Sequence, residues 1–367
     1  MRHSILPFFS RCLLPIAIAV ACLASPASAQ PAGAQGDDFL YRVARNDTLI
    51  SLAEKYTTGA QNWQALQTLN NVADPRQLPI GLLLRIPFHM IPLLPGDATV
   101  AHVSGEAWLD QRPLKPGDSV AEGGSIRTGG NGFVTLNLRD GSAITIPSNA
   151  SVAIQRLRVF KNAPLTDTIL SVDNGSLESN VAPEKKGVGR FEVRTPVSIT
   201  GVRGTRLRVH ASTDGARSEV LEGAVQLDTE GKDSARLTNN QGAAIDSSGR
   251  LLGVSTLLPA PRLPAIDPAD HSGSLSFPAV SGASSYLVRI AADPAGQQPL
   301  SSQITRTPVA TYGRSASESY LMVRAIDEAG IGGHDAIISI PAGRVLVSSD
   351  GTPVRSGYAG TIQLTNY

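Results

Sequence analysis

Cysteine is almost absent from this sequence of 367 residues, which contains only Cys12 and Cys22. Both lie in the first thirty residues, so a chain that has lost this leader has no disulfide, no thiol nucleophile and no cysteine ligand for a metal. Aromatic residues are also scarce, at 5%. Together with 35 glycines and 25 prolines, this scarcity is typical of a turn-rich, mainly β protein.

The sequence also lacks an excess of charge of either sign. It has 32 basic and 31 acidic residues, and removing Arg2 and Arg11 with the leader leaves 30 against 31, a net charge of −1. Such a balance gives no reason to expect nucleic acid as a partner.

Common catalytic motifs are missing too. There is no GxSxG, P-loop or dinucleotide fingerprint. The histidines beyond the leader are well separated and form no HxH or HExxH pair: His89, His102, His210, His271 and His334. The carboxylate pairs Asp37-Asp38 and Asp327-Glu328 fall in predicted loops. We therefore expect no enzyme, no catalytic residue, no metal and no cofactor.

The leader itself has the pattern of a signal peptide. Arg2 and Arg11 flank the apolar run LLPIAIAVACLA, and Ala27-Ser28-Ala29 gives a small-x-small cleavage site before Gln30. The run is shorter than the roughly 20 residues of a spanning helix. We predict a cleaved signal peptide over residues 1–29, and hence an exported protein, with no membrane span in the mature chain. Lipidation at Cys22 is an open alternative.

A small α+β unit is predicted over residues 38–88, after a flexible lead-in at 30–37. A strand at 40–43 is followed by a helix whose inward face is Leu49, Leu52, Ala53 and Tyr56, at helical spacing. A second helix is expected at 63–69 and a returning strand at 83–86. Asp47 is expected to cap the first helix.

This βααβ unit resembles a LysM domain. YRVARNDTLISLAEKY, LQTLNNVADPRQL and LPIGLLLRIP match the family's three conserved stretches, although Asn46 replaces the usual glycine and Pro79-Ile80-Gly81 shifts the usual Pro-Gly by one residue. The resemblance implies binding of the N-acetylglucosamine-containing glycan of peptidoglycan in a shallow groove between two loops. The carbohydrate-binding residues that it implies are Asn46, Asp47, Thr48, Leu49, Leu78, Pro79, Ile80 and Gly81. Asp47 as a cap only and Leu49 as core only remain alternatives.

The stretch from Phe191 to Val209 organises the central part. Apolar residues alternate along it, which predicts half-buried strands around a bend at Gly201 and Gly204. Upstream, Asp140-Gly141 sits between alternating runs and predicts a hairpin. The arginines of the region are expected either to form a basic strip for an acidic partner or merely to solvate outward strand positions: Arg190, Arg194, Arg203, Arg206 and Arg208.

With the VLEGAVQL strand pair downstream, these motifs resemble the FecR domain, a periplasmic β-rich module known from iron-transport signalling. We assign the FecR-like domain to residues 97–254, and the resemblance implies sensing or scaffolding with no chemistry. The apolar, proline-broken segment 88–96 before it is expected to be a short, semi-rigid connection, with the first edge of the central domain as the alternative.

Residues 255–272 hold four prolines and are predicted to be an interdomain linker. Residues 273–367, a sandwich domain and its tail, more weakly resemble fibronectin type III, with Phe277-Pro278 in place of the family's tryptophan.

The expected fold class is mainly β and multidomain. The resemblances imply a non-enzymatic periplasmic peptidoglycan-binding protein. It is expected to attach to the cell wall through LysM and to present its β domains to an envelope protein partner for sensing, signalling or scaffolding. The alternatives are a wall-remodelling enzyme with an unrecognised active site, and an envelope adaptor that uses its LysM fold for protein contact alone.

Overall fold

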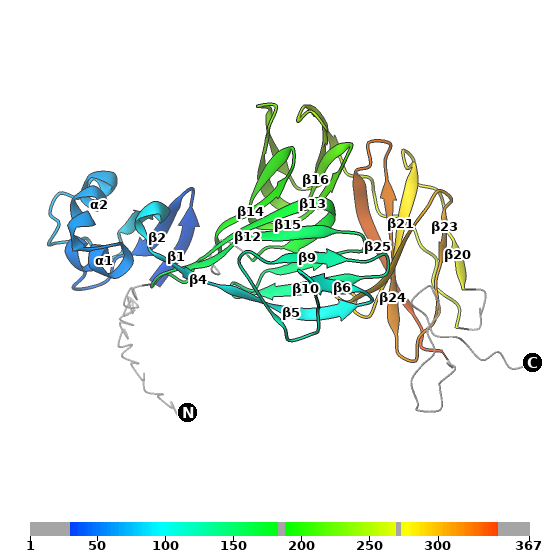
Figure 1. The fold of residues 1–367 in the computed structure, drawn as a ribbon. Coiled ribbons are helices and arrows are strands. Elements are labelled where there is room, and N and C mark those ends of the chain that lie inside the picture. Colours follow the sequence, from blue (N-terminus) through cyan, green and yellow to red (C-terminus); the bar gives the residue numbers. More distant parts are fainter. Residues whose placement is uncertain (1–29, 183–187, 269–272, 344–367) are drawn as a thin grey trace, which may run out of the picture.

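The computed structural model describes residues 30–182, 188–268 and 273–343, which form three β-rich parts in a row (Figure 1). The fold is mainly β, as predicted, with a small α+β module at the N-terminal end. The predicted leader and the segment 344–367 lie outside the described residues. In the part that the structure describes, no helix is long and apolar enough to cross a membrane.

The N-terminal module is a three-stranded antiparallel sheet covered by two helices. Its elements are β1 Gln30–Gln35, β2 Asp38–Arg42, α1 Leu49–Tyr56, a 3₁₀ turn Ala60–Asn62, α2 Trp63–Asn70 and β3 Leu83–Pro87. The helix face predicted from spacing is buried, and so are Leu84 and Ile86 of β3.

The prediction of a flexible lead-in at residues 30–37 was wrong. These residues form β1, which pairs with β2 through a turn at Gly36. Ala34 is buried, but the remaining residues are small or polar, so the backbone ladder rather than an apolar pattern makes the strand. Hydrophobic periodicity cannot detect a strand of this kind.

A large twisted sheet fills the centre. Within the described residues it has sixteen strands, and ten of them run in the order β19-β18-β16-β15-β14-β13-β11-β10-β5-β8. The strands are β4 Leu93–Pro95, β5 Asp97–Ser104, β6 Ala107–Leu109, β7 Arg112–Pro113, β8 Ser119–Ala121, β9 Ser125–Thr128, β10 Phe133–Leu138, β11 Ala143–Ile146, β12 Ser151–Phe160, β13 Thr166–Asn180, β14 Val188–Thr195, β15 Ser198–Ser212, β16 Gly215–Thr229, β17 Ser234–Thr238, β18 Gln241–Asp246 and β19 Leu251–Thr256.

The predicted hairpin at Asp140-Gly141 joins β10 to β11. Leu136 pairs with Ile144 and Val134 with Ile146, and all four side chains are buried. Gly141 has φ 85°, a left-handed conformation that glycine adopts without steric cost. The alternating pattern therefore predicted both the pairing and the buried face.

The stretch 191–209 contains no bend at Gly201. The chain turns earlier, at Pro196-Val197 between β14 and β15, and β15 then runs continuously to Ser212. The irregularity is a bulge between Arg203 and Arg206, with Gly204 at φ 56°. A Cβ on Gly201 would meet no other atom closer than 3.9 Å, so its surroundings do not require glycine.

Gly223 of β16 faces this bulge and makes the close approach instead. A Cβ on Gly223 would lie 2.7 Å from Thr205 Oγ1 and 2.9 Å from the carbonyl oxygen of Gly204. The Thr205 hydroxyl also donates to the carbonyl of Ala224. Gly204 of β15 and Gly223 of β16 therefore lie on the two sides of one close contact between paired strands.

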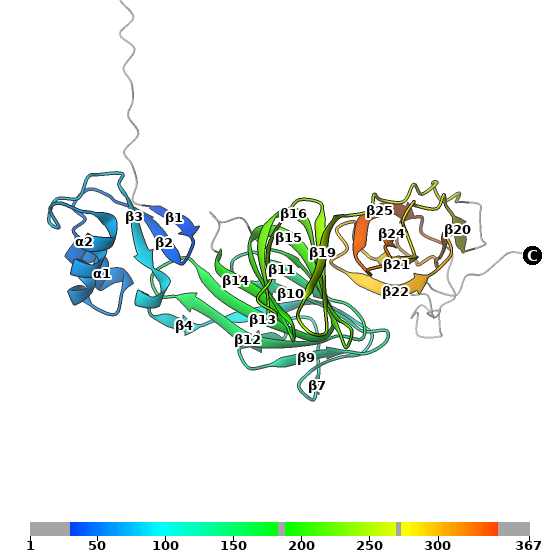
Figure 2. The same ribbon diagram turned by 90° about the horizontal axis from the view of Figure 1, so that it is seen from above.

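The β12–β13 hairpin extends beside β4 toward the N-terminal module and packs against it (Figure 2). Phe160 of the hairpin stacks on Phe88 with ring centroids 4.5 Å apart, and Ala163 and Leu165 join the core of the module. The segment 88–96 begins with a 3₁₀ turn, Phe88–Met90, and continues into β4, which pairs with β12. It therefore provides the first edge of the central sheet, the alternative to a plain connection.

The C-terminal part consists of a two-stranded and a four-stranded sheet around one core. Its strands are β20 Ser274–Ser276, β21 Ser285–Ala291, β22 Pro299–Thr305, β23 Val309–Thr311, β24 Ser319–Ile326 and β25 Gly332–Ile340. The proline-rich stretch before it begins in β19 and has no helix or strand from residue 257 to residue 268, yet it is packed against the protein. Leu257 and Ile266 are buried, and the amide of His334 donates to the carbonyl of Leu258.

We predict that Gly223→Ala destabilises the central sheet whereas Gly201→Ala does not. Gly223 has φ 91° and no room for a Cβ, and such strain costs about 1–3 kcal/mol. Gly201 has ordinary space, so alanine there should leave stability unchanged or slightly raised by stiffening the unfolded chain. Urea unfolding of the two variants measures the difference. Equal midpoints would contradict the structural role assigned to Gly223.

Candidate functional site

The two loops that the LysM resemblance assigns to sugar binding lie side by side. The Gly81 amide donates to the Val43 carbonyl at 2.8 Å, and the Val43 amide donates to the Leu82 carbonyl at 2.9 Å. The Arg42 guanidinium also donates to the Gly81 carbonyl at 3.2 Å. The fold therefore brings residues 46–49 and 78–81 to one end of the module.

The prediction that Asp47 caps α1 was wrong, because the cap is Thr48. Thr48 Oγ1 accepts from the Ser51 amide, while Ser51 Oγ accepts from the Thr48 amide, which makes a reciprocal capping box. Asp47 instead accepts from the Ala44 amide at 2.7 Å and from the Tyr41 hydroxyl at 3.0 Å. Burial and the Asp47 carboxylate raise the pKa of Tyr41, so its hydroxyl stays protonated and donates. Asp47 therefore braces the loop.

Burial separates the eight predicted residues into three groups, of which Asp47, Thr48 and Gly81 are the partly buried one. Leu49 and Leu78 are buried in the core of the module, as the core interpretation of Leu49 requires. Asn46, Pro79 and Ile80 are exposed, and Ile80 exposes 55% of its surface. Among the eight residues, exposed apolar surface for a sugar contact is therefore offered by Ile80 and Pro79.

Backbone donors in these loops are largely used inside the module. The amides of Asp47, Thr48, Leu49 and Gly81 donate to Ala44, Ser51, Pro75 and Val43, respectively. Asn46 has φ 72° and Gly81 has φ 86°. Asparagine tolerates this left-handed conformation better than most residues, so Asn46 preserves the turn while adding an exposed amide side chain. Asn46 and Ile80 are therefore the best-placed contacts for an acetamido sugar.

The arginines of the central domain do not form a basic strip. Arg190 makes a bidentate ion pair with the buried Asp167, at 2.7 Å for both contacts, and Arg194 pairs with Glu192 at 2.7 Å. Arg208 is buried, with 5% of its side chain exposed. Arg206 is exposed, and the side chain of Arg203 lies outside the described part of the structure. The interpretation that all five only solvate the sheet also fails, because Arg208 is at a domain interface.

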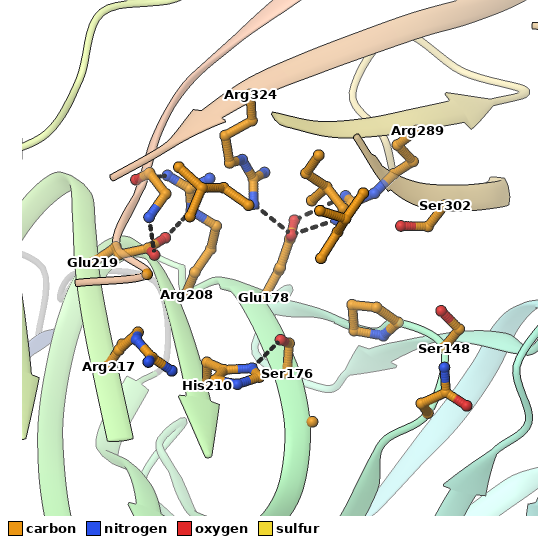
Figure 3. A pocket seen from close by; sticks show the side chains of 18 of the residues that line it. Ser148, Ser176, Glu178, Arg208, His210, Arg217, Glu219, Arg289, Ser302 and Arg324 are labelled. Carbon is orange, nitrogen blue, oxygen red and sulfur yellow. Dashed lines mark hydrogen bonds and ion pairs between the residues drawn. The ribbon is translucent and has the colours of Figure 1, made fainter. Parts of the chain in front are cut away.

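That interface holds a group of buried charges that sequence reasoning missed, here called the interface ion cluster (Figure 3). Its members are Glu178, Arg208 and Glu219 of the large sheet and Arg289, Arg324 and Asp335 of the C-terminal part. Side chains alternate between the two faces of a strand. The sequence gives no sign that another domain covers the face on which these charged residues lie.

Ion pairs from Glu178 and hydrogen bonds from Arg208 and to Glu219 cross the interface. Glu178 Oε1 lies 2.6 Å from Arg289 Nη2 and 3.1 Å from Arg324 Nη1. Arg208 pairs with Glu219 at 2.8 Å and donates to the carbonyl of Gly333 at 2.7 Å. The Gly332 amide donates to Glu219 at 2.6 Å. Burial disfavours the charged carboxylate, but Arg289 and Arg324 hold the pKa of Glu178 well below its ordinary value.

The comparisons with known proteins support the domain predictions for the first two parts of the chain. A LysM domain family model matches residues 41–87, and a FecR protein family model matches residues 124–226. The chain therefore carries a LysM domain followed by a FecR domain, in the predicted order. The fibronectin-like resemblance of the C-terminal part stays a prediction.

Two solved structures match part of the chain. Both are of a "putative anti-sigma factor" from Parabacteroides distasonis ATCC 8503, at 18% and 19% identity, with a TM-score of 0.30. Each match covers 36% of this chain and spans 59% of the length of that protein. No curated protein matches the chain.

We predict that Glu178→Gln lowers the free energy of unfolding by about 3 kcal/mol at pH 7, because the buried Arg289 loses its ion-pair partner and the buried Arg324 keeps only Asp335. A carboxylate whose folded pKa lies below its ordinary value of 4.5 stabilises the fold above that pH. The stabilisation is lost as the pH falls through the folded pKa. The difference between wild type and variant should therefore shrink below about pH 4.5 in urea unfolding. The exposed Glu222, on the same sheet, provides the control Glu222→Gln. A difference that does not change with pH would contradict the ion-pair role.

Proposed function

We propose that this protein is a non-enzymatic periplasmic protein that attaches to peptidoglycan through its LysM domain and presents its FecR domain to an envelope partner. One observation carries the proposal: the LysM match coincides with two adjacent loops that expose Ile80 and Asn46. The signal-peptide pattern of residues 1–29 supports export. LysM and FecR domains both fit an extracytoplasmic, wall-associated protein.

A single module of this kind offers little contact area, so the proposed affinity comes from repetition. Peptidoglycan presents many copies of the same sugar along one strand, and rebinding to neighbouring copies raises the apparent affinity without new contacts. The apolar junction at Phe88 and Phe160 holds the module against the large sheet. Attachment of the module would therefore also place the FecR domain at the wall.

The test is co-sedimentation of the exported chain, residues 30–367, with purified peptidoglycan. We expect Ile80→Glu to weaken retention about tenfold, since a carboxylate replaces the exposed apolar contact. Leu252→Glu is the matched control, because Leu252 is 57% exposed on β19 of the large sheet against 55% for Ile80. Soluble oligomers of N-acetylglucosamine should release the wild-type protein.

Three results would overturn parts of this proposal. Equal retention of both variants would remove the LysM loops from wall binding. Retention that the sugar oligomers do not compete would favour an adaptor that uses the LysM fold for protein contact. Release of soluble muropeptides from the sedimented wall would favour a remodelling enzyme.

A further inference from the structure

The interface between the large sheet and the C-terminal part contains a cleft of about 710 Å³, and members of the interface ion cluster line part of it. Figure 3 shows Ser176, His210 and Ser148 on one side of this space and Arg289 and Ser302 on the other. Its volume falls within the roughly 300–1,000 Å³ of small-molecule sites.

The charges around the cleft do not balance. Three arginines and three carboxylates of the interface ion cluster compensate one another. Arg217 also lines the cleft, and within the described residues no carboxylate forms an ion pair with it. Its Nε donates only to a backbone carbonyl, that of Ala329, at 2.5 Å. The cleft therefore has one uncompensated positive charge.

Arg289 has a side-chain donor without a hydrogen-bond partner. Its side chain is 5% exposed and both terminal nitrogens bind Glu178, but its Nε has no hydrogen-bond partner among the residues that the structure describes. Buried donors without a partner are rare in folded proteins, and each calls for an explanation. Arg289 lines the same cleft as Arg217 but comes from the other domain.

Neutral polar groups and aliphatic groups complete the walls. Ser176 Oγ lies 2.9 Å from His210 Nδ1. Burial, and to a smaller extent the nearby charge of Arg217, lowers the pKa of His210. Its ring is therefore a neutral hydrogen-bonding group. Asn149 and Ser302 add an amide and a hydroxyl, while Leu287 adds apolar surface. Such a mixture fits a short peptide, whose backbone and side chains need both kinds of contact.

We propose that this cleft binds a short, carboxylate-bearing peptide, namely the stem peptide of peptidoglycan, with a carboxylate on Arg217. The proposal rests on the proposed function, because wall attachment supplies this ligand. The stem peptide carries free carboxylates on a short chain, in keeping with the size and the positive charge of the cleft. The LysM domain and the cleft would then bind the glycan and the peptide of one polymer.

The test is calorimetric titration of the 30–367 chain with the disaccharide-tetrapeptide that a muramidase releases from peptidoglycan. Arg217→Gln should weaken its binding about tenfold, the effect of losing one charge-assisted hydrogen bond. Arg306→Gln is the matched control, since Arg306 is exposed and forms no ion pair among the described residues. The same ligand with its carboxylates amidated should bind wild type as weakly as the unmodified ligand binds Arg217→Gln.

A second variant guards against loss of folding. Ser302→Asp places a carboxylate beside Arg289, because residues 302 and 289 are directly paired on β22 and β21. Because Ser302 lines the cleft, this added negative charge should repel the carboxylates of the ligand and lower its affinity, while the unfolding midpoint stays at or above that of wild type.

The two proposals fail in different ways. If Ile80→Glu abolishes binding of sugar oligomers but the tetrapeptide adds no affinity that depends on Arg217, the cleft proposal is overturned and wall attachment stands. If sugar oligomers do not bind at all but the tetrapeptide binds through Arg217, the cleft proposal stands and the LysM proposal fails. Binding that amidation leaves unchanged also overturns the cleft proposal.

Discussion

Buried charge is tolerated between two domains only when each charged group has a partner, and this constraint fixes how the C-terminal part sits on the large sheet. Glu178 bridges two arginines of the other domain, and Glu219 accepts from the Gly332 amide. Sliding one domain along the other would leave several buried charges without partners at the same time, whereas the side chains of an apolar interface could repack. The same fixed placement holds the cleft open beside the cluster and positions Arg217 and Arg289 on its two sides.

The other junction depends on different physics. Between the LysM domain and the large sheet, the stacked pair Phe88 and Phe160 is joined by the hydrogen bond from Asn162 to the carbonyl of Lys55, at 2.6 Å. Burial of apolar surface depends little on salt or pH, while a cluster of ionisable groups responds to pH. The FecR domain therefore lies between an apolar junction that is insensitive to acid and an ionic one that is sensitive to it.

Local patterns predicted what local physics controls. The spacing of Leu49, Leu52, Ala53 and Tyr56 predicted the buried face of α1, and alternation around Asp140-Gly141 predicted both strands and their turn. Where two neighbouring residues could do the same job, the pattern failed. Asp47 and Thr48 are both good capping residues, and the choice of Thr48 follows from its extended backbone and from the use of Asp47 by Ala44 and Tyr41.

The sequence by itself determined the mainly β class, the order of the LysM and FecR domains and the faces that their strands bury, because periodicity and turn chemistry act over a few residues. Tertiary structure alone decided which polar residues would meet. Arg208 looked like an outward arginine and is buried, and Glu178 and Arg289, 111 residues apart, form the central ion pair. Partners at such separations are chosen by how domains pack, and no local pattern in the chain encodes that choice.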